Sequence, residues 1–223
     1  KKILVRQTLL EISRRAKYIK LKTNNGSVLI HLGMSGSLGF SSEKRTLKHT
    51  HISLEISRKK EKIFVHYTDP RRFGYWFAAE EKEPLTPLLR LGSEPLDEKK
   101  TLTEYLFTKS RKKKAPIKTF IMNQEVLVGV GNIYACEALF FSKIHPETPA
   151  SSLSLKDFFR LVMTIQNVLL EAIKLGGTTL KDFSQPDGKI GYFVQSLRVY
   201  GQEGKACCVC RQKIKALRLA GRS

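Results

Sequence analysis

The spacing of apolar residues changes once along the chain, and this change limits the possible folds more than any other feature. Between residues 3 and about 77 the apolar residues form short runs or alternate with polar ones, as in His51-Ile52-Ser53-Leu54-Glu55-Ile56. A period of two is typical of a half-buried strand. Beyond residue 100 they recur every three or four positions, as in helices. The sequence therefore predicts a β-rich part followed by a helical part.

The β-rich part has the signals of an antiparallel sandwich or barrel. Asn25-Gly26 lies between two β-prone runs, and Asn-Gly is the strongest short hairpin signal. We expect strands at Ile3-Leu4-Val5, Tyr18–Leu21, Val28–Leu32, His51–Ile56 and Ile63–Tyr67.

Prolines and glycines separate the two parts and bound the helices. Pro84, Pro87 and Pro95, with Gly92, mark a linker over residues 81–100. Further on, the helix signals are a capping-box pattern at Ser154–Asp157, an apolar run at Ile133–Phe141 and a stop at Gly176-Gly177. Strand character returns at Tyr192–Val194 and Leu197–Tyr200, just before the cysteines.

The charge of the chain points to a polyanionic partner. Forty Lys and Arg stand against twenty Asp and Glu, giving a formal net charge of +20. Nucleic acid or an anionic membrane surface would explain such an excess. The basic residues are spread along the chain instead of gathering on one amphipathic helix, which favours a long polyanion. No apolar run reaches the roughly 18 residues of a membrane span.

The four cysteines show no spaced disulfide framework, so we expect a cytosolic protein. Cys207 and Cys210 form one C-x-x-C, which is half of a tetrahedral zinc site. The alternative is a pair of reduced thiols in a basic tail. Cys136 is expected to be a small core residue.

Two loops carry side chains that can enter a base stack. Met34 lies between Gly33 and Gly36, and it is either core filler or an apolar wedge. Asp69–Gly74 is a turn with two arginines and Phe73, which is either an ordinary turn with a core Phe or a probe of the gap left by a displaced base.

Three further segments have the features of ligand-binding loops. Gly129–Tyr134 opens a helix and can offer backbone N–H groups to a DNA phosphate, although it lacks a full dinucleotide-binding pattern. The basic run Arg111–Lys114 is predicted to contact phosphate. Gly176–Phe183 is a polar loop suited to a planar ligand such as a base, or an ordinary helix connection.

Taken together, these segments resemble the bacterial formamidopyrimidine-DNA glycosylases. The resemblance covers essentially the whole chain and rests on the order and spacing of Arg14–Tyr18, His31–Leu38, Lys48–His51, Asp69–Gly74, Gly129–Glu137, Gly176–Phe183 and the cysteines. It implies an α+β fold with an N-terminal β-sandwich (1–80), a linker (81–100), a helix–two-turn–helix domain (101–188) and a partial zinc-ribbon-like hairpin (189–223).

The resemblance also implies a role for single residues. Lys17 resembles a proton donor for β-elimination and Arg222 a phosphate-gripping arginine of δ-elimination. His49, Arg71, Lys113 and Asn132 match DNA-binding positions, and Met34, Arg71 and Phe73 match the side chains that fill the stack. The base-recognition loop would comprise Thr178, Thr179, Leu180, Lys181, Asp182 and Phe183, and Zn²⁺ would be held by Cys207, Cys210 and a second cysteine pair.

The implied function is base-excision repair, in which oxidised purines such as 8-oxoguanine are removed and the abasic strand is cleaved. In the family an N-terminal proline supplies the amine of the Schiff base, whereas this sequence begins at Lys1 and ends before a second cysteine pair. We therefore expect a fragment that is inactive alone but binds DNA. A covalent adduct trapped by borohydride on an 8-oxoguanine duplex would contradict this expectation.

Three alternatives remain open. One is the related endonuclease VIII type, which prefers oxidised pyrimidines; the probe residues and the Thr178–Phe183 loop favour the purine-specific branch. Another is a non-catalytic relative that binds damaged DNA. An RNA-binding protein has the charge but would need a recognisable RNA motif. We expect a monomer in the bacterial cytosol, associated with the nucleoid and with double-stranded damaged DNA, and not with a membrane.

Overall fold

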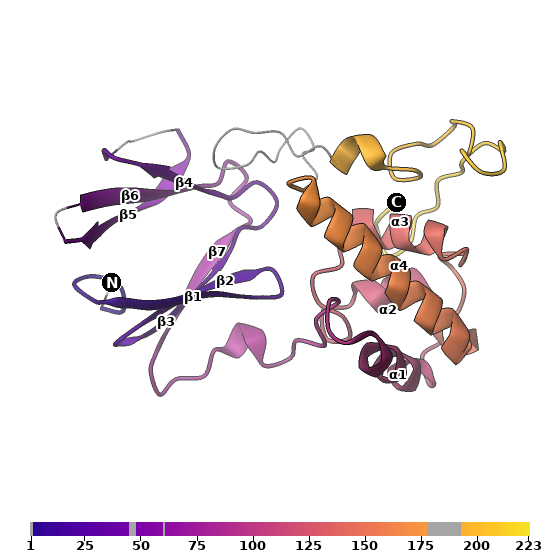
Figure 1. Ribbon diagram of the computed structural model, residues 1–223, viewed down its shortest axis with the longest axis horizontal. Helices are drawn as coiled ribbons and strands as arrows, with labels where there is room; N and C mark the ends of the chain where they lie inside the picture. The colour runs from indigo at the N-terminus through magenta and orange to yellow at the C-terminus, as the bar shows by residue number, and fades with distance from the viewer. Residues whose placement is uncertain (1, 45–47, 60, 178–192) are drawn as a thin grey trace. The chain divides into compact units, whose positions relative to one another are not determined.

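The computed structural model describes residues 2–44, 48–59, 61–177 and 193–223. The chain forms two compact units (Figure 1). Unit 1 comprises Lys1–Leu89 and Gly176–Val194, and unit 2 comprises Arg90–Leu175 and Gln195–Ser223. Each unit therefore combines segments that are distant in the sequence.

Unit 1 contains two antiparallel sheets that lie in two layers (Figure 1). The strand order of the first sheet is β1-β2-β3-β7, with bounds Leu9–Arg15, Tyr18–Thr23, Gly26–His31 and Tyr75–Glu80. The order of the second is β4-β6-β5, with bounds Ser37–Ser41, Glu61–Thr68 and Thr50–Arg58. The predicted N-terminal β-sandwich is confirmed.

The predicted hairpin between the second and third strands is also present. Thr23 pairs with Gly26, so Asn24 and Asn25 form the turn. Gly26 has a φ of 142°, and a Cβ there would lie 2.3 Å from the carbonyl oxygen of Ala79 on β7. The glycine is thus required by both its backbone conformation and the close approach of the neighbouring strand.

The predicted strand at Ile3–Val5 is wrong, because these residues lie in turns. Ile3 is nevertheless buried, and it packs against Val28 and Ile30 of β3. Its carbonyl oxygen accepts a hydrogen bond from the hydroxyl of Thr23. The apolar run therefore reflects burial against the sheet and not membership of it.

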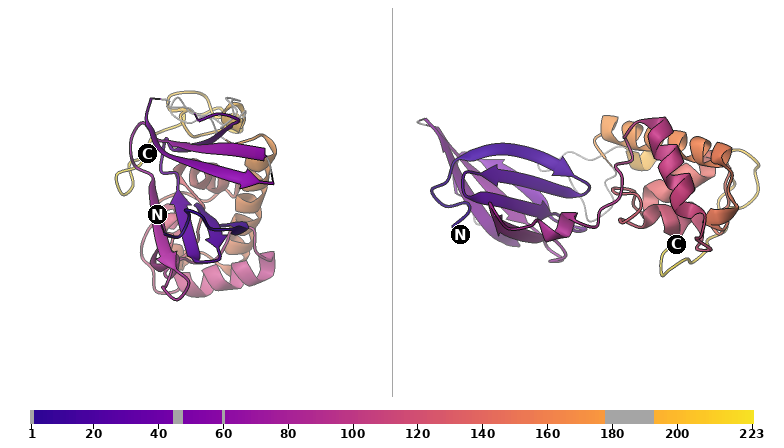
Figure 2. Two further views of the ribbon diagram at one scale, coloured as in Figure 1. Left: turned by 90° about the vertical axis from the view of Figure 1, so that its left-hand side faces the viewer. Right: turned by 90° about the horizontal axis from the view of Figure 1, so that it is seen from below.

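Unit 2 is a helical unit with one contiguous apolar core. Figure 2 (right) shows α1 crossing α4, and the two helices are in contact. The fully buried Phe158 of α4 meets Phe107 and Phe120 edge-on. The four helices are α1 (Lys99–Ser110), α2 (Ile117–Met122), α3 (Asn132–Phe141) and α4 (Leu155–Lys174).

The caps of α4 agree with the sequence prediction. The Ser154 hydroxyl accepts from the backbone N–H of Asp157, and the Asp157 carboxylate accepts from the backbone N–H of Ser154. Beyond the helix, Gly176 and Gly177 have φ values of 73° and 92°, which end the helical path. Among the described residues no helix is long and apolar enough to cross a membrane.

The predicted strands before the cysteines are wrong. Phe193–Ser196 forms a short 3₁₀ helix, η3, and Leu197–Tyr200 contains no strand; Tyr192 lies outside the described residues. The buried carboxylate of Glu137 on α3 accepts the backbone N–H groups of Arg198, Val199 and Tyr200 at 2.9–3.0 Å. A side chain therefore satisfies the donors that a neighbouring strand would otherwise satisfy.

Candidate nucleic-acid interface

In unit 1, Lys17 lies in the two-residue turn that joins β1 to β2. Arg15 pairs with Tyr18 across this turn, and Ala16 has a φ of 53°. The Lys17 side chain is exposed, whereas Ala16 is buried. The turn thus presents the ammonium at the end of the four-stranded sheet, next to His31 of β3, whose pKa is lowered first by burial and then by the charge of Lys17.

Two loops of unit 1 interlock beside this turn. A Cβ on Gly33 would lie 2.5 Å from the backbone nitrogen of Gly74 and 2.6 Å from the carbonyl carbon of Phe73. Gly36 donates its N–H to the carbonyl of Leu32 and so closes the first loop. The backbones of residues 33–36 and 69–74 are therefore in direct contact.

Asp69 holds the second loop in shape. Only 1% of Asp69 is exposed. Its carboxylate accepts from the Ser35 hydroxyl at 2.6 Å, from the Gly74 N–H at 2.8 Å and from the Tyr67 hydroxyl at 3.1 Å. Its N–H donates to the carbonyl of His49 at 3.0 Å. Asp69 thus connects its own loop, residues 69–74, to the loop of residues 33–36 and to the loop that contains His49.

Hydrogen bonds to the Asp69 carboxylate lower its pKa by more than burial raises it. Burial alone would raise the pKa of the carboxyl, but bonds from Ser35, Gly74, Tyr67 and the backbone of Arg72 lower it below its usual value. Asp69 is therefore ionised at neutral pH. Its role in ordering the loop was not predicted from the sequence, although the sequence Asp-Pro at the start of a turn is a general signal for such a bond.

The interlocked loops display Met34, Arg71 and Phe73. Met34 is 57% exposed and Phe73 is 56% exposed. The guanidinium of Arg71 lies over the ring of Phe73, 5.1 Å from its centroid. The interpretations of Met34 as core filler and of Phe73 as a core residue are therefore wrong, and both side chains are available for contact with a ligand.

His49 belongs to the same end of unit 1. It is exposed and has a φ of 66°, which points to a constrained loop backbone. Its carbonyl accepts the hydrogen bond from the N–H of Asp69. The structure thus brings together Lys17, Met34, His49, Arg71 and Phe73, which are separated by up to 56 positions in the sequence.

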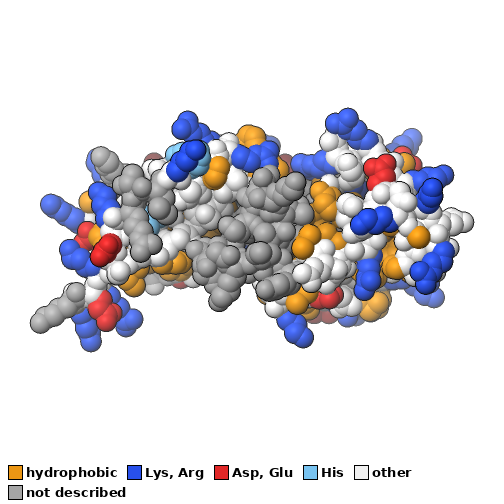
Figure 3. All heavy atoms as spheres, turned by 90° about the horizontal axis from the view of Figure 1, so that it is seen from above, with side chains coloured by type: hydrophobic (Ala, Val, Ile, Leu, Met, Phe, Trp, Pro, Cys, Tyr) orange, Lys and Arg blue, Asp and Glu red, His pale blue; other side chains and the backbone are white. Residues whose placement is uncertain are grey.

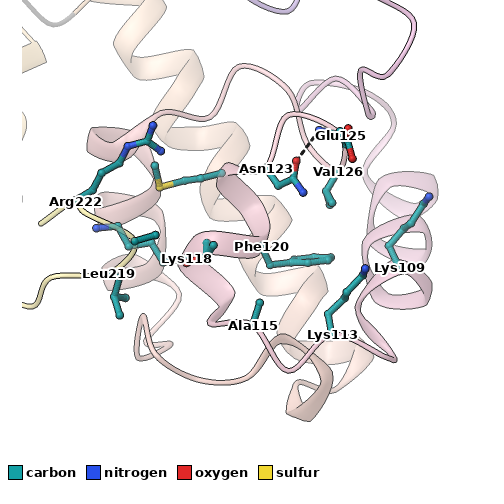
Figure 4. A pocket seen from close by; sticks show the side chains of 13 residues that line it. Lys109, Lys113, Ala115, Lys118, Phe120, Asn123, Glu125, Val126, Leu219 and Arg222 are labelled. Carbon is teal, nitrogen blue, oxygen red and sulfur yellow. Dashed lines mark hydrogen bonds between the residues drawn. The ribbon is translucent and has the colours of Figure 1, made fainter.

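In unit 2, Lys113 and Arg222 line one cavity of about 500 Å³ (Figure 4). Lys109 and Lys118 also line it, and Glu125 is its one acidic lining residue. Phe120, Met122 and Val126 supply apolar surface. The cavity therefore combines an apolar wall with an excess of positive charge, which suits an anionic ligand with an apolar part.

Lys118 is a candidate that the sequence did not suggest. It is only 4% exposed, and its ammonium donates to the main-chain oxygen of Ser223. Buried lysines are rare unless they are paired or functional. The periodicity of α2 places this side chain on a buried face, but the short helix gave no clear signal.

The basic run Arg111–Lys114 divides into two kinds of residue. Arg111 donates to the carbonyls of Phe107 and Leu153 and to the hydroxyl of Ser110. Lys112, Lys113 and Lys114 are exposed. Arg111 is thus engaged in local structure, and the three lysines remain the candidates for phosphate contact.

Asn132 is the first residue of α3, where backbone N–H groups lack partners within the helix. The buried oxygen of its side chain has no hydrogen-bond partner among the described residues. Asn132 does not line the cavity that contains Lys113 and Arg222. The predicted base-recognition residues Thr178–Phe183 lie outside the described residues.

Cys207 and Cys210 form a tight turn. The N–H of Val209 points at the Cys207 sulfur at 3.4 Å, and backbone bonds from Cys210 and Val209 lower the pKa of the Cys207 thiol. A lowered pKa favours the thiolate that binds zinc. Among the described residues no group of three or more His, Cys, Asp or Glu could hold a metal.

Positive charge covers both units. Figure 3 shows Lys and Arg side chains spread over the visible face of each, in keeping with the formal net charge of +20. Neither unit confines its charge to one helix. Basic residues on both units are typical of a protein that binds a polyanion.

Comparison with known proteins identifies the family. Residues 1–76 match the formamidopyrimidine-DNA glycosylase N-terminal domain, and residues 91–184 match the H2TH domain of the same enzymes. A formamidopyrimidine-DNA glycosylase of Glaesserella parasuis is 52% identical over 212 residues, which cover 94% of this chain and 76% of the relative. One of Aliivibrio fischeri is 48% identical over 99% of this chain and 80% of the relative.

Solved structures give the same result. The Fpg protein of Thermus thermophilus superposes with a TM-score of 0.83 and 36% identity, over 97% of this chain and 80% of that one. The Lactococcus lactis Fpg in complex with DNA containing an abasic site superposes with a TM-score of 0.81 and 30% identity, over 97% and 79%. On the sequence and the fold together, this chain belongs to the formamidopyrimidine-DNA glycosylase family.

Proposed function

We propose that this protein serves base-excision repair as a DNA glycosylase that recognises oxidised purines and cleaves the strand at the abasic site. The observation that carries the proposal is the joint display of Met34, Arg71 and Phe73 on loops fixed by Asp69. Exposed apolar side chains beside a guanidinium suit the space that a flipped-out base leaves in the stack. The relatives' names and their DNA complexes support the same ligand.

The chemistry assigns different roles to the two units. In unit 1, Lys17 provides an exposed ammonium beside the probe loops and would donate a proton during β-elimination. In unit 2, Lys113, Asn132 and Arg222 would hold phosphate, and Arg222 would assist δ-elimination. Thr178–Phe183 would contact the displaced base. The probe side chains recognise the gap, while the cations bind the backbone without regard to sequence.

We also propose zinc as a structural cofactor and retain the predicted domain limits of 1–80, 101–188 and 189–223. Cys207 and Cys210 would hold the metal through thiolates, and the lowered pKa of Cys207 fits this role. When bound, zinc would fix the turn of Cys207 and Cys210. In the sequence this turn lies between residues 198–200, which the Glu137 carboxylate binds, and Arg222.

Binding to duplexes that have the same sequence and differ only in the lesion tests the proposal. We expect tighter binding to a duplex with 8-oxoguanine than to one with thymine glycol or to an undamaged duplex. Equal affinity for all three would contradict lesion recognition and favour a general DNA-binding protein. A preference for thymine glycol would favour the endonuclease VIII type. Borohydride trapping on the same duplexes tests separately whether the chain alone is inactive.

A further inference from the structure

Three rings from three neighbouring strands form a cluster beside Lys17. Tyr18 of β2, His31 of β3 and Tyr75 of β7 are direct cross-strand partners. The ring of His31 stacks on Tyr75 with a centroid distance of 5.5 Å and an interplanar angle of 16°, and it meets Tyr18 at 5.1 Å and 57°. His31 is thus enclosed by two tyrosine rings.

Hydrogen bonds fix the rings in this arrangement. The hydroxyls of Tyr18 and Tyr75 lie 2.6 Å apart, which closes the cluster around the imidazole. Gly33 donates its N–H to Nδ1 of His31 at 3.1 Å. Because Nδ1 must keep its lone pair to accept this bond, the proton of the neutral ring is on Nε2.

We propose that Tyr75 is a positioning residue: its ring and hydroxyl hold His31 as an uncharged hydrogen-bond donor beside Lys17. The surface around His31 then carries one positive charge fewer when it meets the DNA backbone. The proposal rests on the proposed function, because the charge matters only if an anionic strand is bound there.

Three physical effects keep His31 neutral. Enclosure by the tyrosines removes water that would stabilise an imidazolium. Protonation of Nδ1 would break the bond from Gly33, whose loop is locked against residues 73 and 74. Lys17, on the turn beside the cluster, repels a second positive charge. In the described part of the chain, the titratable groups whose rings contact His31 are Tyr18 and Tyr75.

Tyr75 is a suitable residue to test because it is 44% exposed. Tyr75→Ala removes the stacked ring and the hydroxyl without leaving a cavity in the core. Tyr75→Phe keeps the ring and removes only the bond to Tyr18. Phe40→Ala is a matched control, since Phe40 is an exposed aromatic residue on β4 of the other sheet.

The first readout is the titration of His31, followed by NMR and assigned with a His31→Gln variant. In the unchanged protein and in Phe40→Ala the midpoint is expected to lie below the ordinary value of about 6.5. In Tyr75→Ala it is expected to rise toward about 6.5, because water regains access to the ring. A midpoint unchanged in Tyr75→Ala overturns the proposal, and an intermediate midpoint in Tyr75→Phe supports it.

The second readout is the salt dependence of DNA binding at pH 6. A higher positive charge on His31 should steepen the slope of log K against log salt in Tyr75→Ala, by at most about 0.9. An equal slope in Tyr75→Ala and the unchanged protein overturns the proposal. Loss of lesion preference in the unchanged protein would instead contradict the proposed function, so the two failures are distinguishable.

Discussion

Two arginines of this protein lie over phenylalanine rings, one in each unit, and they differ in what else they contact. Arg111 at the end of α1 lies 3.9 Å from the centroid of Phe107 and donates to two backbone carbonyls. Arg71 lies 5.1 Å from the centroid of Phe73, on a loop whose ring is itself exposed. The same pair of residue types thus helps to close a helical unit in one place and lies on the proposed recognition surface in the other.

The difference arises from how each backbone is held. The buried Asp69 carboxylate fixes the loop that carries Arg71 through its hydrogen bonds to Ser35 and Gly74. The exposed side chains of this loop therefore need not stabilise it. At the end of α1, by contrast, Arg111 itself links the helix to the carbonyl of Leu153. A buried carboxylate therefore holds the Arg71 loop, whereas the exposed Arg111 helps to hold the end of its own helix.

The largest effect is expected for Asp69→Asn. The amide keeps the size of the carboxylate but cannot accept all of its hydrogen bonds, and we expect a loss of about 2–4 kcal/mol in the free energy of unfolding. Urea unfolding measures it. Glu55→Gln, at an exposed ion pair with Lys62, should cost less than about 0.5 kcal/mol; an equally small loss at Asp69 would contradict its role as the anchor.

The same variant has a predicted pH signature. Because the pKa of Asp69 is lowered by folding, its ionised form stabilises the protein fully above the unfolded value of about 3.9. This contribution disappears as the pH falls from there through the lowered folded pKa. Asp69→Asn should therefore show a flatter loss of stability below about pH 4 than the unchanged protein.

Arg111→Ala should mainly reduce stability. It removes the bonds to the carbonyls of Phe107 and Leu153 and the ring contact, which together are worth about 1–2 kcal/mol. Thermal unfolding measures the loss. Lesion preference in a binding assay should stay unchanged, and its disappearance would show that Arg111 contacts DNA directly.

Arg71→Ala should have the opposite effect: it should weaken lesion binding and leave the stability of the fold nearly unchanged. We expect stability within about 0.5 kcal/mol of the unchanged protein, because the side chain is exposed. Affinity for the 8-oxoguanine duplex should fall about tenfold, more than affinity for undamaged DNA. Equal losses on both duplexes would reduce Arg71 to a general phosphate contact.

Lys113→Met should give the smallest change in DNA binding among the variants that alter the proposed interface. Loss of one phosphate contact lowers the magnitude of the salt slope by about 0.9 and weakens binding to lesion and undamaged duplexes alike. Lys44→Met, at an exposed lysine of unit 1 that lies outside the predicted contacts, serves as the control. A slope unaffected by Lys113→Met would remove this residue from the proposed interface.

The sequence predicted the regular elements better than the contacts that order the site. Period-two alternation at His51–Ile56 and the capping box at Ser154 are local patterns, and the structure contains both. Helix α1 was not singled out, because its apolar residues form only a weak pattern around the buried Leu102 and Leu106.

The anchors of the site depend on residues far apart in the chain. Asp69 binds Ser35, which is 34 positions away, and Glu137 binds Tyr200, which is 63 positions away. Local patterns contain no information on such pairs. The residue types of the two loops, together with the resemblance to the family, pointed to Met34, Arg71 and Phe73 as candidates, whereas only the structure shows what holds them in place.

The Glu137 anchor has a consequence for how this protein can change. Its carboxylate accepts hydrogen bonds from the backbone N–H groups of residues 198–200, so these bonds do not involve the side chains of those residues. Any residue except proline can supply such an N–H. The path into the cysteine turn is therefore held by a carboxylate on a helix some 60 positions earlier, and these three hydrogen bonds restrict residues 198–200 only by excluding proline.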